Sequence, residues 1–349
     1  MPSLRDLLVN PDYYLNSVDL GAGQCHFLKL GDDAYRRSSF MDHRLRLQTG
    51  VSIQASLAEL EGMVRESRAS RCPSPVHYIF HTAFCCSTLI SRCLDIEGLS
   101  RALREPAVLM QLANYKRTGD AYPFDGDRWP GLLSTVLFLL AKPRTDGEIV
   151  VVKPTNAANN LAVDIVHMPR TGGVLLLYSK LDQFLVSILK KGEEGRAFVR
   201  RLFNVIRRDS ERARSLSVES LAQLTDMQMA AFVWYLQMDA YLRLLTEFPN
   251  AAIRTLDCDT FLAAPLTTLA KLCHLFEIRV EQGALEAIAA GPGFTRYSKD
   301  ESRDYDSSAR TSENEQIVRE HRETLDGILA WSEGLRPEGP IKLPLIRAL

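Results

Sequence analysis

The sequence of 349 residues lacks several features that would place it in a large class of proteins. Acidic and basic residues nearly cancel, leaving a formal charge of -1, so no overall field favours nucleic acid or an anionic membrane. The longest apolar run, residues 132–141, is too short to span a bilayer, and residues 1–15 contain no apolar segment of signal-peptide type. We therefore expect a soluble cytoplasmic protein with no nucleic-acid partner and no membrane span.

Metal-ligand and disulfide patterns are also missing. The seven cysteines are odd in number and show neither zinc-ligand spacing nor the even framework of a secreted domain. Several lie inside apolar helical patterns, so we expect reduced and mostly buried thiols and no metal site. They occupy positions 25, 72, 85, 86, 93, 258 and 273.

Short apolar runs that alternate with helical patterns are the main organising feature of the chain. The runs at residues 76–80, 99–103, 149–152, 174–178 and 251–256 are β-branched or apolar and too short for ordinary helices. This alternation predicts a P-loop-like three-layer α/β/α fold with a central, mostly parallel sheet. Ligands of such sheets bind at the carboxyl ends of the strands, so the residues that follow each strand are candidates for function.

We expect three parts in the chain. They are an N-terminal extension packed on the core (residues 1–75), an α/β core (76–280) and a C-terminal helical segment (281–349). The extension has a strand pattern near residues 25–30 and a helical pattern near 53–64. In the last part, residues 291–311 are a possible lid loop, and the capping box Ser312-x-x-Glu315 predicts the start of the final helix.

The loop after the first core strand reads H-T-A-F-C-C-S-T at residues 81–88. It is not a Walker A loop, because it has neither a glycine nor the Gly-Lys pair, so ATP with magnesium is not expected. The helical pattern that starts at Ser87 points the helix dipole at the loop, which favours an anion. Ser87 and Thr88 are therefore either ordinary helix caps or ligands of a phosphate oxygen.

Two more strand ends carry a charged residue directly before a proline. Glu105 and Lys153 occupy these positions, and a following proline is expected to hold each of them extended. Both side chains would then face the crevice, where an acid and a base can carry out proton transfer; the alternative is two surface charges. After the fourth strand comes a cluster that is either a second phosphate site or a solvated helix face, formed by Lys180, Ser187, Lys190 and Lys191.

Taken together, these residues resemble the sulfotransferase family that uses the sulfate donor PAPS, nearest its tyrosylprotein and bacterial branch. The sequence Cys86-Ser87-Thr88 after a strand resembles the family's 5′-phosphosulfate loop, whose usual form is Arg/Lys-Ser-Gly-Thr/Ser-Thr. Residues 179–187 resemble the 3′-phosphate motif, with Ser187 at the position of its serine. The resemblance covers roughly residues 76–276.

The resemblance implies PAPS as co-substrate, PAP as product and no metal. Glu105 falls where the tyrosylprotein branch has its glutamate base, and Lys153 resembles that branch's strand-end lysine. The implied reaction is in-line transfer of a sulfuryl group to a hydroxyl or amine, with Lys153 neutralising the leaving oxygen. The implied donor-binding residues are Phe84, Cys85, Cys86, Ser87, Thr88, Ser179, Lys180, Ser187, Lys191 and Arg296.

The sequence departs from the family pattern at three positions. The loop cation is replaced by Phe84, the loop glycine by Cys86 and the 3′-motif arginine by Ser179. Each missing cation removes charge-assisted hydrogen bonds of about 1.5–3 kcal/mol unless another residue supplies them. Candidate replacements are His81, which also joins Glu105 and Lys153 as a catalytic candidate, Arg92, Lys180, Arg296, Lys299 and Arg310.

Two other functions remain open from the sequence. One is a non-catalytic protein on the same fold that binds a nucleotide or a partner. The other is a cysteine-dependent phosphatase, since Cys86 and Arg92 form a C-x5-R string. The sequence leaves the acceptor, a small molecule or a peptide, and the oligomeric state open.

Overall fold

The computed structural model describes residues 2–42, 44–45, 52–70, 74–119, 128–291, 293–294, 296–297, 300–304 and 307–349. At residues 68–70, 296–297, 300–304 and 307–310 the description covers the backbone alone. No helix in the described part of the chain is long and apolar enough to cross a membrane.

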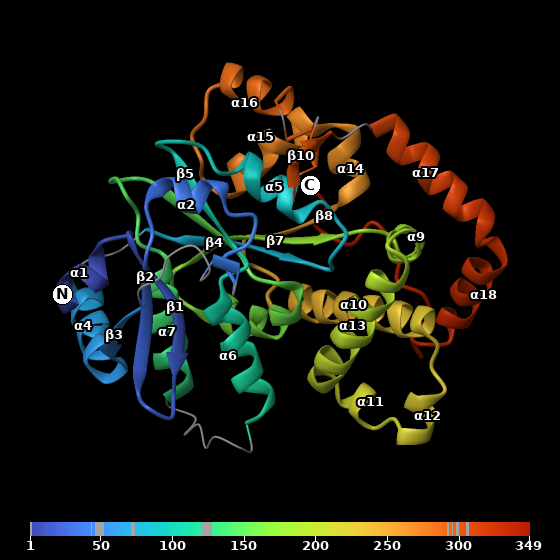
Figure 1. Cartoon of the computed structure of the whole chain (residues 1–349), viewed down its shortest axis with the longest axis horizontal. Helices are drawn as coiled ribbons and strands as arrows, with labels where there is room; N and C mark the ends of the chain where they lie inside the picture. The colour runs from blue at the N-terminus through green and yellow to red at the C-terminus, as the bar shows by residue number, and fades with distance from the viewer. Residues whose placement is uncertain are drawn as a thin grey trace.

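A five-stranded parallel sheet forms the centre of the molecule, in the order β5-β6-β4-β7-β8 (Figure 1). Its strands are β4 (Val76–His81), β5 (Ser100–Arg104), β6 (Ile149–Lys153), β7 (Thr171–Tyr178) and β8 (Ile253–Asp257). All six residues of β4 are buried, as expected for a parallel strand that is covered on both faces. The predicted α/β/α architecture and its five strands are confirmed.

Helices cover both faces of this sheet and create two apolar cores. Tyr78 and Phe80 of β4 face one core, and Ile79 faces the other, because successive side chains of a strand point to opposite faces. The smaller core is closed by α5 (Ser87–Cys93), α14 (Cys258–Ala263), α15 (Pro265–Leu275) and α16 (Gln282–Ala289). The larger is closed chiefly by α6 (Ala107–Arg117), α7 (Arg128–Leu140), α8 (Ala162–His167), α9 (Leu181–Lys190), α10 (Gly192–Ile206) and α13 (Asp226–Glu247).

Other elements connect and flank these layers. They are η1 (Asn156–Leu161), η2 (Arg207–Asp209), α11 (Glu211–Arg214), α12 (Val218–Ala222), β9 (Arg296–Tyr297), β10 (Asp300–Asp304), α17 (Ser307–Glu320) and α18 (Arg322–Glu333). The start predicted at Ser312 is wrong, because the helical backbone of α17 already begins at Ser307. The expected lid loop instead contains the β9–β10 pair and the first turn of α17. At the C-terminus, the Leu349 N–H donates to the Thr255 carbonyl (3.0 Å), which covers the edge of β8.

The N-terminal part adds a separate antiparallel sheet in the order β1-β2-β3. Its elements are α1 (Leu4–Val9), β1 (Tyr13–Asp19), β2 (Gln24–Lys29), α2 (Asp32–Arg37), β3 (Ser52–Ser56) and α4 (Leu57–Ser70). The strand predicted near residues 25–30 is present. The helix predicted near 53–64 starts too early, because residues 52–56 pair with β2 as a strand and the helix begins at Leu57.

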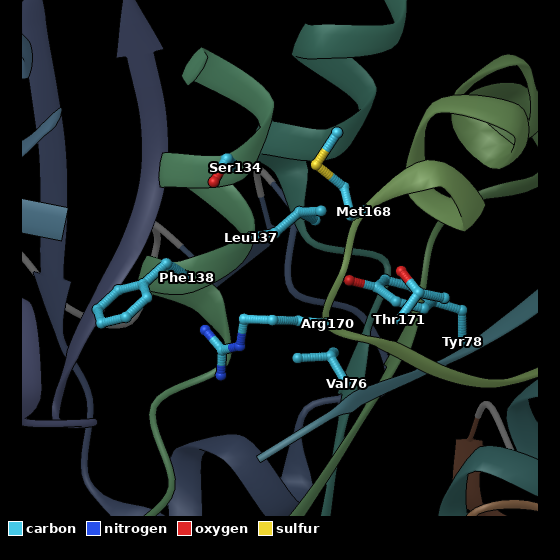
Figure 2. Close-up of a pocket in the computed structure, with 8 residues that line it drawn as sticks. All are labelled: Val76, Tyr78, Ser134, Leu137, Phe138, Met168, Arg170 and Thr171. Atoms are coloured by element: carbon cyan, nitrogen blue, oxygen red, sulfur yellow. The ribbon is translucent and has the colours of Figure 1, made fainter. Parts of the chain in front are cut away.

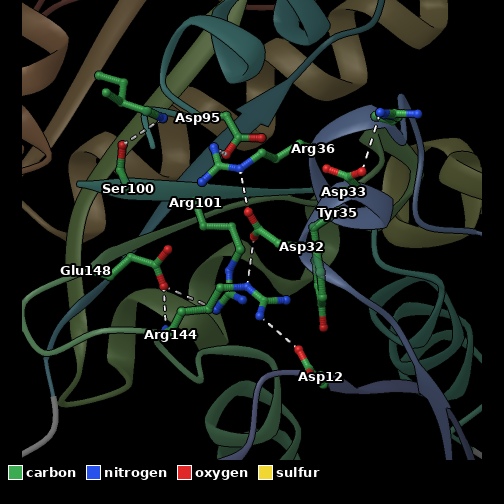
Figure 3. A network of polar contacts seen from close by, with 12 residues as sticks. Asp12, Asp32, Asp33, Tyr35, Arg36, Asp95, Ser100, Arg101, Arg144 and Glu148 are labelled. Atoms are coloured by element: carbon green, nitrogen blue, oxygen red, sulfur yellow. Dashed lines mark hydrogen bonds and ion pairs between the residues drawn. The ribbon is translucent and has the colours of Figure 1, made fainter. Parts of the chain in front are cut away.

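A polar network joins this N-terminal part to the edge of the central sheet, around β5 (Figure 3). Arg144 lies 2.8 Å from both Asp12 and Asp32, and Arg36 bonds Asp32 at 2.8 Å. The buried Arg104 of β5 donates to carbonyl oxygens of residues 35, 36 and 38 and to Asp95. Met41 lies beside the end of β5, because its N–H donates to the Arg104 carbonyl at 2.6 Å and its carbonyl accepts the Ala107 N–H at 3.0 Å.

Candidate functional site

The sheet reverses its strand order at β4, which has β6 on one side and β7 on the other. A crevice outside the carboxyl ends of the strands is expected at such a switch point. The loop that leaves β4 runs through residues 82–86 into α5. It therefore occupies the position where parallel α/β proteins bind their ligands.

The loop has an unusual backbone for a segment without glycine. Ala83, Phe84 and Cys86 have φ values of 73°, 50° and 60°, in the left-handed region that favours glycine. Turns of this kind direct successive backbone N–H groups to one side and form anion-binding concavities. Because α5 has only seven residues, the expected anion site rests on these loop N–H groups rather than on a helix dipole. Strain of this kind is typical of functional sites.

Glu105 and Lys153 meet at the ends of the adjacent strands β5 and β6. The Glu105 Oε1 atom lies 2.6 Å from Lys153 Nζ, and the Glu105 N–H donates to the Lys153 carbonyl at 2.7 Å. The Lys153 side chain is fully buried, whereas 16% of the Glu105 side chain is exposed. The sequence correctly placed Lys153 at the end of a strand. The extended backbone expected at Glu105 is wrong, because its φ is 58° and the chain turns sharply there.

His81 ends β4 and completes a group of three ionisable side chains. Its Nε2 lies 3.9 Å from Glu105 Oε1, and its Nδ1 accepts the Ala83 N–H at 3.2 Å. An accepting Nδ1 assigns the proton of the neutral ring to Nε2, the atom that faces Glu105. We call His81, Glu105 and Lys153 the Glu105 corner. It combines a carboxylate, an ammonium and an imidazole at the carboxyl edge of the sheet.

The aromatic and sulfur side chains of the loop point into packed surroundings. The Phe84 ring packs against Phe184 (5.8 Å between centroids) and Phe198 (5.3 Å). The Cys85 thiol donates to the Leu177 carbonyl at 3.7 Å, and burial raises its pKa to about 12, so it stays a thiol at neutral pH. Neither side chain offers a charge to an anion.

The side chain of Cys86 contacts a second cysteine, Cys258. It shares a hydrogen bond with Cys258, and this contact, followed by burial, raises the pKa of the Cys258 thiol. Residues 87–92 are helical, and Arg92 donates to Ser39 Oγ at 2.9 Å. A helical C-x5-R segment cannot wrap a phosphate, so the geometry does not support the phosphatase reading.

The other side of the loop, at the ends of β7 and β8, is built differently. Ser179 is buried, and its carbonyl accepts the Trp234 indole N–H at 2.8 Å. Lys180 is half-exposed and its Nζ lies 3.9 Å from both Asp257 and Asp259. Burial raises the pKa of Asp257, while Lys180 acts in the opposite direction. We call Ser179, Lys180, Asp257 and Asp259 the β7–β8 side.

The remaining residues predicted for donor binding are engaged elsewhere. Ser187 lies inside α9 and donates to the Gln183 carbonyl at 2.9 Å, and Lys191 lies 3.5 Å from Glu194. Among the residues described, no hydrogen bond or ion pair joins Ser187 or Lys191 to the loop. The Arg296 and Arg310 side chains and all of Lys299 fall outside the described residues.

Asp257, Cys258 and Asp259 have ligand atoms within 4.8 Å of one another, which is a spacing compatible with a metal ion. Lys180 already places its ammonium between the two carboxylates. That ammonium supplies one positive charge against two carboxylates.

Three buried amide side chains support the loop from below, and the sequence reading missed them. Asn159 donates to the His81 carbonyl at 3.1 Å, and Gln237 donates to the Thr82 carbonyl at 3.2 Å. Asn156 in turn donates to Gln237 at 3.3 Å. The sequence T-N-A-A-N-N after the strand end at Lys153 was the available signal, since amides that follow a buried strand face the same edge.

The amino end of β4 contains only a very small cavity (Figure 2). Val76, Tyr78, Arg170 and Thr171 contribute to its lining, and its volume is about 10 Å³. This volume admits roughly one water molecule. It does not compete with the carboxyl edge as a ligand site.

Comparison with known proteins gives structural likenesses only. No protein-family model matches the chain, and no curated protein matches it. The chain is similar to a sulfotransferase domain from the curacin biosynthetic pathway, with 13% identity and a TM-score of 0.42 over 72% of this chain and 98% of that one. It is also similar to a sulfotransferase from Alicyclobacillus acidocaldarius, with 12% identity and a TM-score of 0.38 over 76% of this chain and 96% of that one. At this identity, neither likeness assigns a function.

Proposed function

We propose that the protein transfers a sulfuryl group from PAPS to a hydroxyl or amine acceptor. The observation that carries the proposal is the Glu105 corner, where a carboxylate, a buried ammonium and an imidazole meet. It lies beside a loop whose left-handed backbone favours an anion. Proton removal and charge neutralisation are the two tasks that such a transfer needs from a protein.

Within this proposal, Glu105 accepts the proton of the acceptor group. The acceptor oxygen or nitrogen forms a bond to sulfur as the bond between sulfur and the bridging phosphate oxygen breaks, and PAP leaves with the negative charge. Protonation removes the charge of Glu105, so Lys153, 2.6 Å away, is released to neutralise that leaving oxygen. The Nε2 atom of His81 lies 3.9 Å from the same Glu105 oxygen and adds a third polar group beside the acceptor.

The structure offers more hydrogen-bond donors to the 5′-phosphosulfate of the donor than to its 3′-phosphate. The left-handed loop, together with Ser87 and Thr88, supplies backbone and hydroxyl donors for the 5′-phosphosulfate. On the β7–β8 side, Lys180 must leave Asp257 and Asp259 before it can meet a 3′-phosphate. A groove of about 810 Å³, lined in part by Gln183 and Asp259, adjoins that side and gives room for a nucleotide.

Calorimetric titration with PAP, and with AMP as the analogue without the 3′-phosphate, tests the donor. We expect saturable PAP binding that weakens with salt, since the contacts are electrostatic, and weaker AMP binding. Lys180→Met should lower the PAP affinity and leave the AMP affinity unchanged, with Lys271→Met, on α15, as a matched control. Absence of PAP binding at millimolar concentration would exclude the proposal.

A non-catalytic nucleotide-binding role is the second candidate. The packing of Phe84 against two aromatic rings favours it, because an apolar side chain stands where the family pattern has a cation. In that case PAP would bind, but radiolabelled PAPS would transfer its sulfuryl group to no member of a broad set of phenols, alcohols, amines and tyrosine peptides. Transfer that Glu105→Gln abolishes would decide for the enzyme.

A further inference from the structure

Two cysteines that perform no step of the proposed transfer meet at the carboxyl edge of the sheet. Cys86 directly precedes α5, and Cys258 is the first residue of α14, which follows β8. In the sheet, β7 lies between β4 and β8. The loop after β4 crosses the end of β7, where the Cys85 thiol donates to the Leu177 carbonyl at 3.7 Å. This crossing brings Cys86 to Cys258, although the two are far apart in the sequence.

The two thiols are in contact but differ in their access to solvent. Their hydrogen bond, followed by burial, raises the pKa of the Cys258 thiol, so Cys258 keeps its proton at neutral pH. Cys258 is only 1% exposed, whereas Cys86 is half-buried. Oxidants react first with the more accessible sulfur. An accessible thiol in contact with a buried one is the arrangement expected of an attacked cysteine and the partner that resolves it.

The other cysteines in the described part of the chain lack this combination. Of the six described, five are buried, and Cys86 is the exception. Cys93 and Cys273 lie near enough for the charge of one to raise the pKa of the other, but their exposures are only 6% and 3%. They provide an internal comparison, a neighbouring pair in which neither sulfur is accessible.

We propose that hydrogen peroxide converts Cys86 and Cys258 into a disulfide. The Cys86 sulfur attacks one peroxide oxygen as the O–O bond breaks, which leaves a sulfenic acid and a water molecule that carries the thiol proton. The Cys258 sulfur then attacks the Cys86 sulfur, the S–O bond breaks, and the departing hydroxide takes the Cys258 proton as a second water. Asp259 Oδ1, which lies 3.9 Å from Cys258 Sγ, is placed to accept this proton on the way. Two thiols lose two electrons in total, and the peroxide gains them.

The bond would fasten the loop after β4 to the β7–β8 side. In the reduced protein, a hydrogen bond between two thiols makes this connection, and Cys86 directly precedes Ser87 and Thr88. The inference is independent of the proposed transfer, because it needs neither PAPS nor an acceptor. It therefore survives if PAP does not bind, and it can fail while PAP binds.

Peptide mapping of the full-length chain tests the bond. The reduced protein is treated with hydrogen peroxide in the presence of EDTA, which removes metal-catalysed oxidation, and is alkylated and digested without reductant. We expect a cross-linked Cys86–Cys258 peptide that lacks two hydrogen atoms, with fragmentation distinguishing Cys86 from Cys85. Dithiothreitol should restore both thiols by exchange. A Cys86 that stays a thiol, ends as a sulfinic acid or pairs with any other cysteine would overturn the proposal.

Variants test the order of the two steps. In Cys258→Ala the sulfenic acid of Cys86 should persist, and its labelling by dimedone should rise at least about tenfold above that of the wild type, because no neighbouring thiol consumes it. Cys86→Ala should leave Cys258 a thiol. Cys273→Ala, a buried cysteine of α15, is the matched control and should leave the yield of cross-link unchanged. Equal dimedone labelling in Cys258→Ala and the wild type would contradict the proposal, and the wild-type peptide map decides if a variant fails to fold.

Discussion

The two sides of the loop after β4 use their charges in opposite ways. In the Glu105 corner, a fully buried lysine faces one carboxylate that is open to the crevice, and the imidazole of His81 lies behind them. On the β7–β8 side, a half-exposed Lys180 lies 3.9 Å from each of two carboxylates. The first arrangement leaves a carboxylate partly exposed beside a buried ammonium, whereas in the second the cation is paired with two carboxylates.

This difference separates the residues proposed for the transfer reaction from the residues proposed to bind the donor. A sulfuryl transferase needs the corner for the reaction and cations for the phosphate ends of the nucleotide. The structure places Glu105 and Lys153 of the corner in contact. On the β7–β8 side, the described cation, Lys180, is paired with carboxylates of the protein itself. We infer that the donor affinity, rather than the acid–base chemistry, is the weaker half of the proposed function. Each of the following predictions tests one side against the other.

Removing the two lysines should have very different costs for folding. Lys153→Met leaves Glu105 beside a buried apolar chain, and we expect the free energy of unfolding to fall by about 3–5 kcal/mol. Lys180→Met removes a half-exposed partner of two carboxylates, and we expect a change of about 0–1 kcal/mol. Urea denaturation of both variants measures the contrast. Similar losses would show that the two sides are equally buried in solution.

Glu105→Gln should remove the chemistry and keep the donor site. The glutamine retains an oxygen that accepts from Lys153, so the corner can still fold, but it cannot accept a proton. We expect the transfer rate to fall about 10²–10⁴-fold while the PAP affinity is unchanged. Glu148→Gln is the control, because Glu148 is a buried glutamate beside Arg101 at the far end of the sheet. An unchanged transfer rate in Glu105→Gln would assign the base elsewhere.

Asp259→Asn should raise the affinity of the β7–β8 side for PAP. The change removes one of the two carboxylates that hold Lys180, and it leaves the N-cap side chain of Asp257 in place. We expect the PAP affinity to rise about twofold to fivefold, the effect of a partly exposed ion pair, and the gain to shrink at high salt. Asp33→Asn, which frees Arg37 on the N-terminal part, should change nothing. A loss of affinity would mean that Asp259 itself contacts the donor.

The sheet was predictable because its strands are nearly continuous apolar runs. Val150, Val151 and Val152 of β6 are all buried, and such runs between helical patterns identify parallel strands without further information. By contrast, β3 has mostly exposed or half-buried residues, so its pairing with β2 leaves no comparable pattern in the sequence.

The site was predictable only where the chain places it directly after a strand. Lys153 was found because it ends a strand and Glu105 because it follows one, but the left-handed turn at Glu105, where its N–H donates to the Lys153 carbonyl, has no signal in the local sequence. The partners of Lys180 lie more than seventy residues away on β8 and α14, so local patterns cannot reveal that its charge is neutralised. The same holds for Gln237 below the loop.

The smallest expected effect concerns the glycine that the loop lacks. Cys86 has a φ of 60°, and a left-handed residue with a side chain costs about 1–2 kcal/mol, whereas glycine costs about 0.5–1 kcal/mol in lost chain entropy. We therefore expect Cys86→Gly to raise the free energy of unfolding by about 0–1 kcal/mol. Gly98→Ala measures the opposite change, the stability cost of adding a side chain to a left-handed residue. The φ of Gly98 is 75°, and an added Cβ would meet nothing within 4 Å. If Cys86→Gly destabilises the protein while Gly98→Ala behaves as expected, the contact between Cys86 and Cys258 outweighs the backbone strain, and the loop is held by the β7–β8 side rather than by its own conformation.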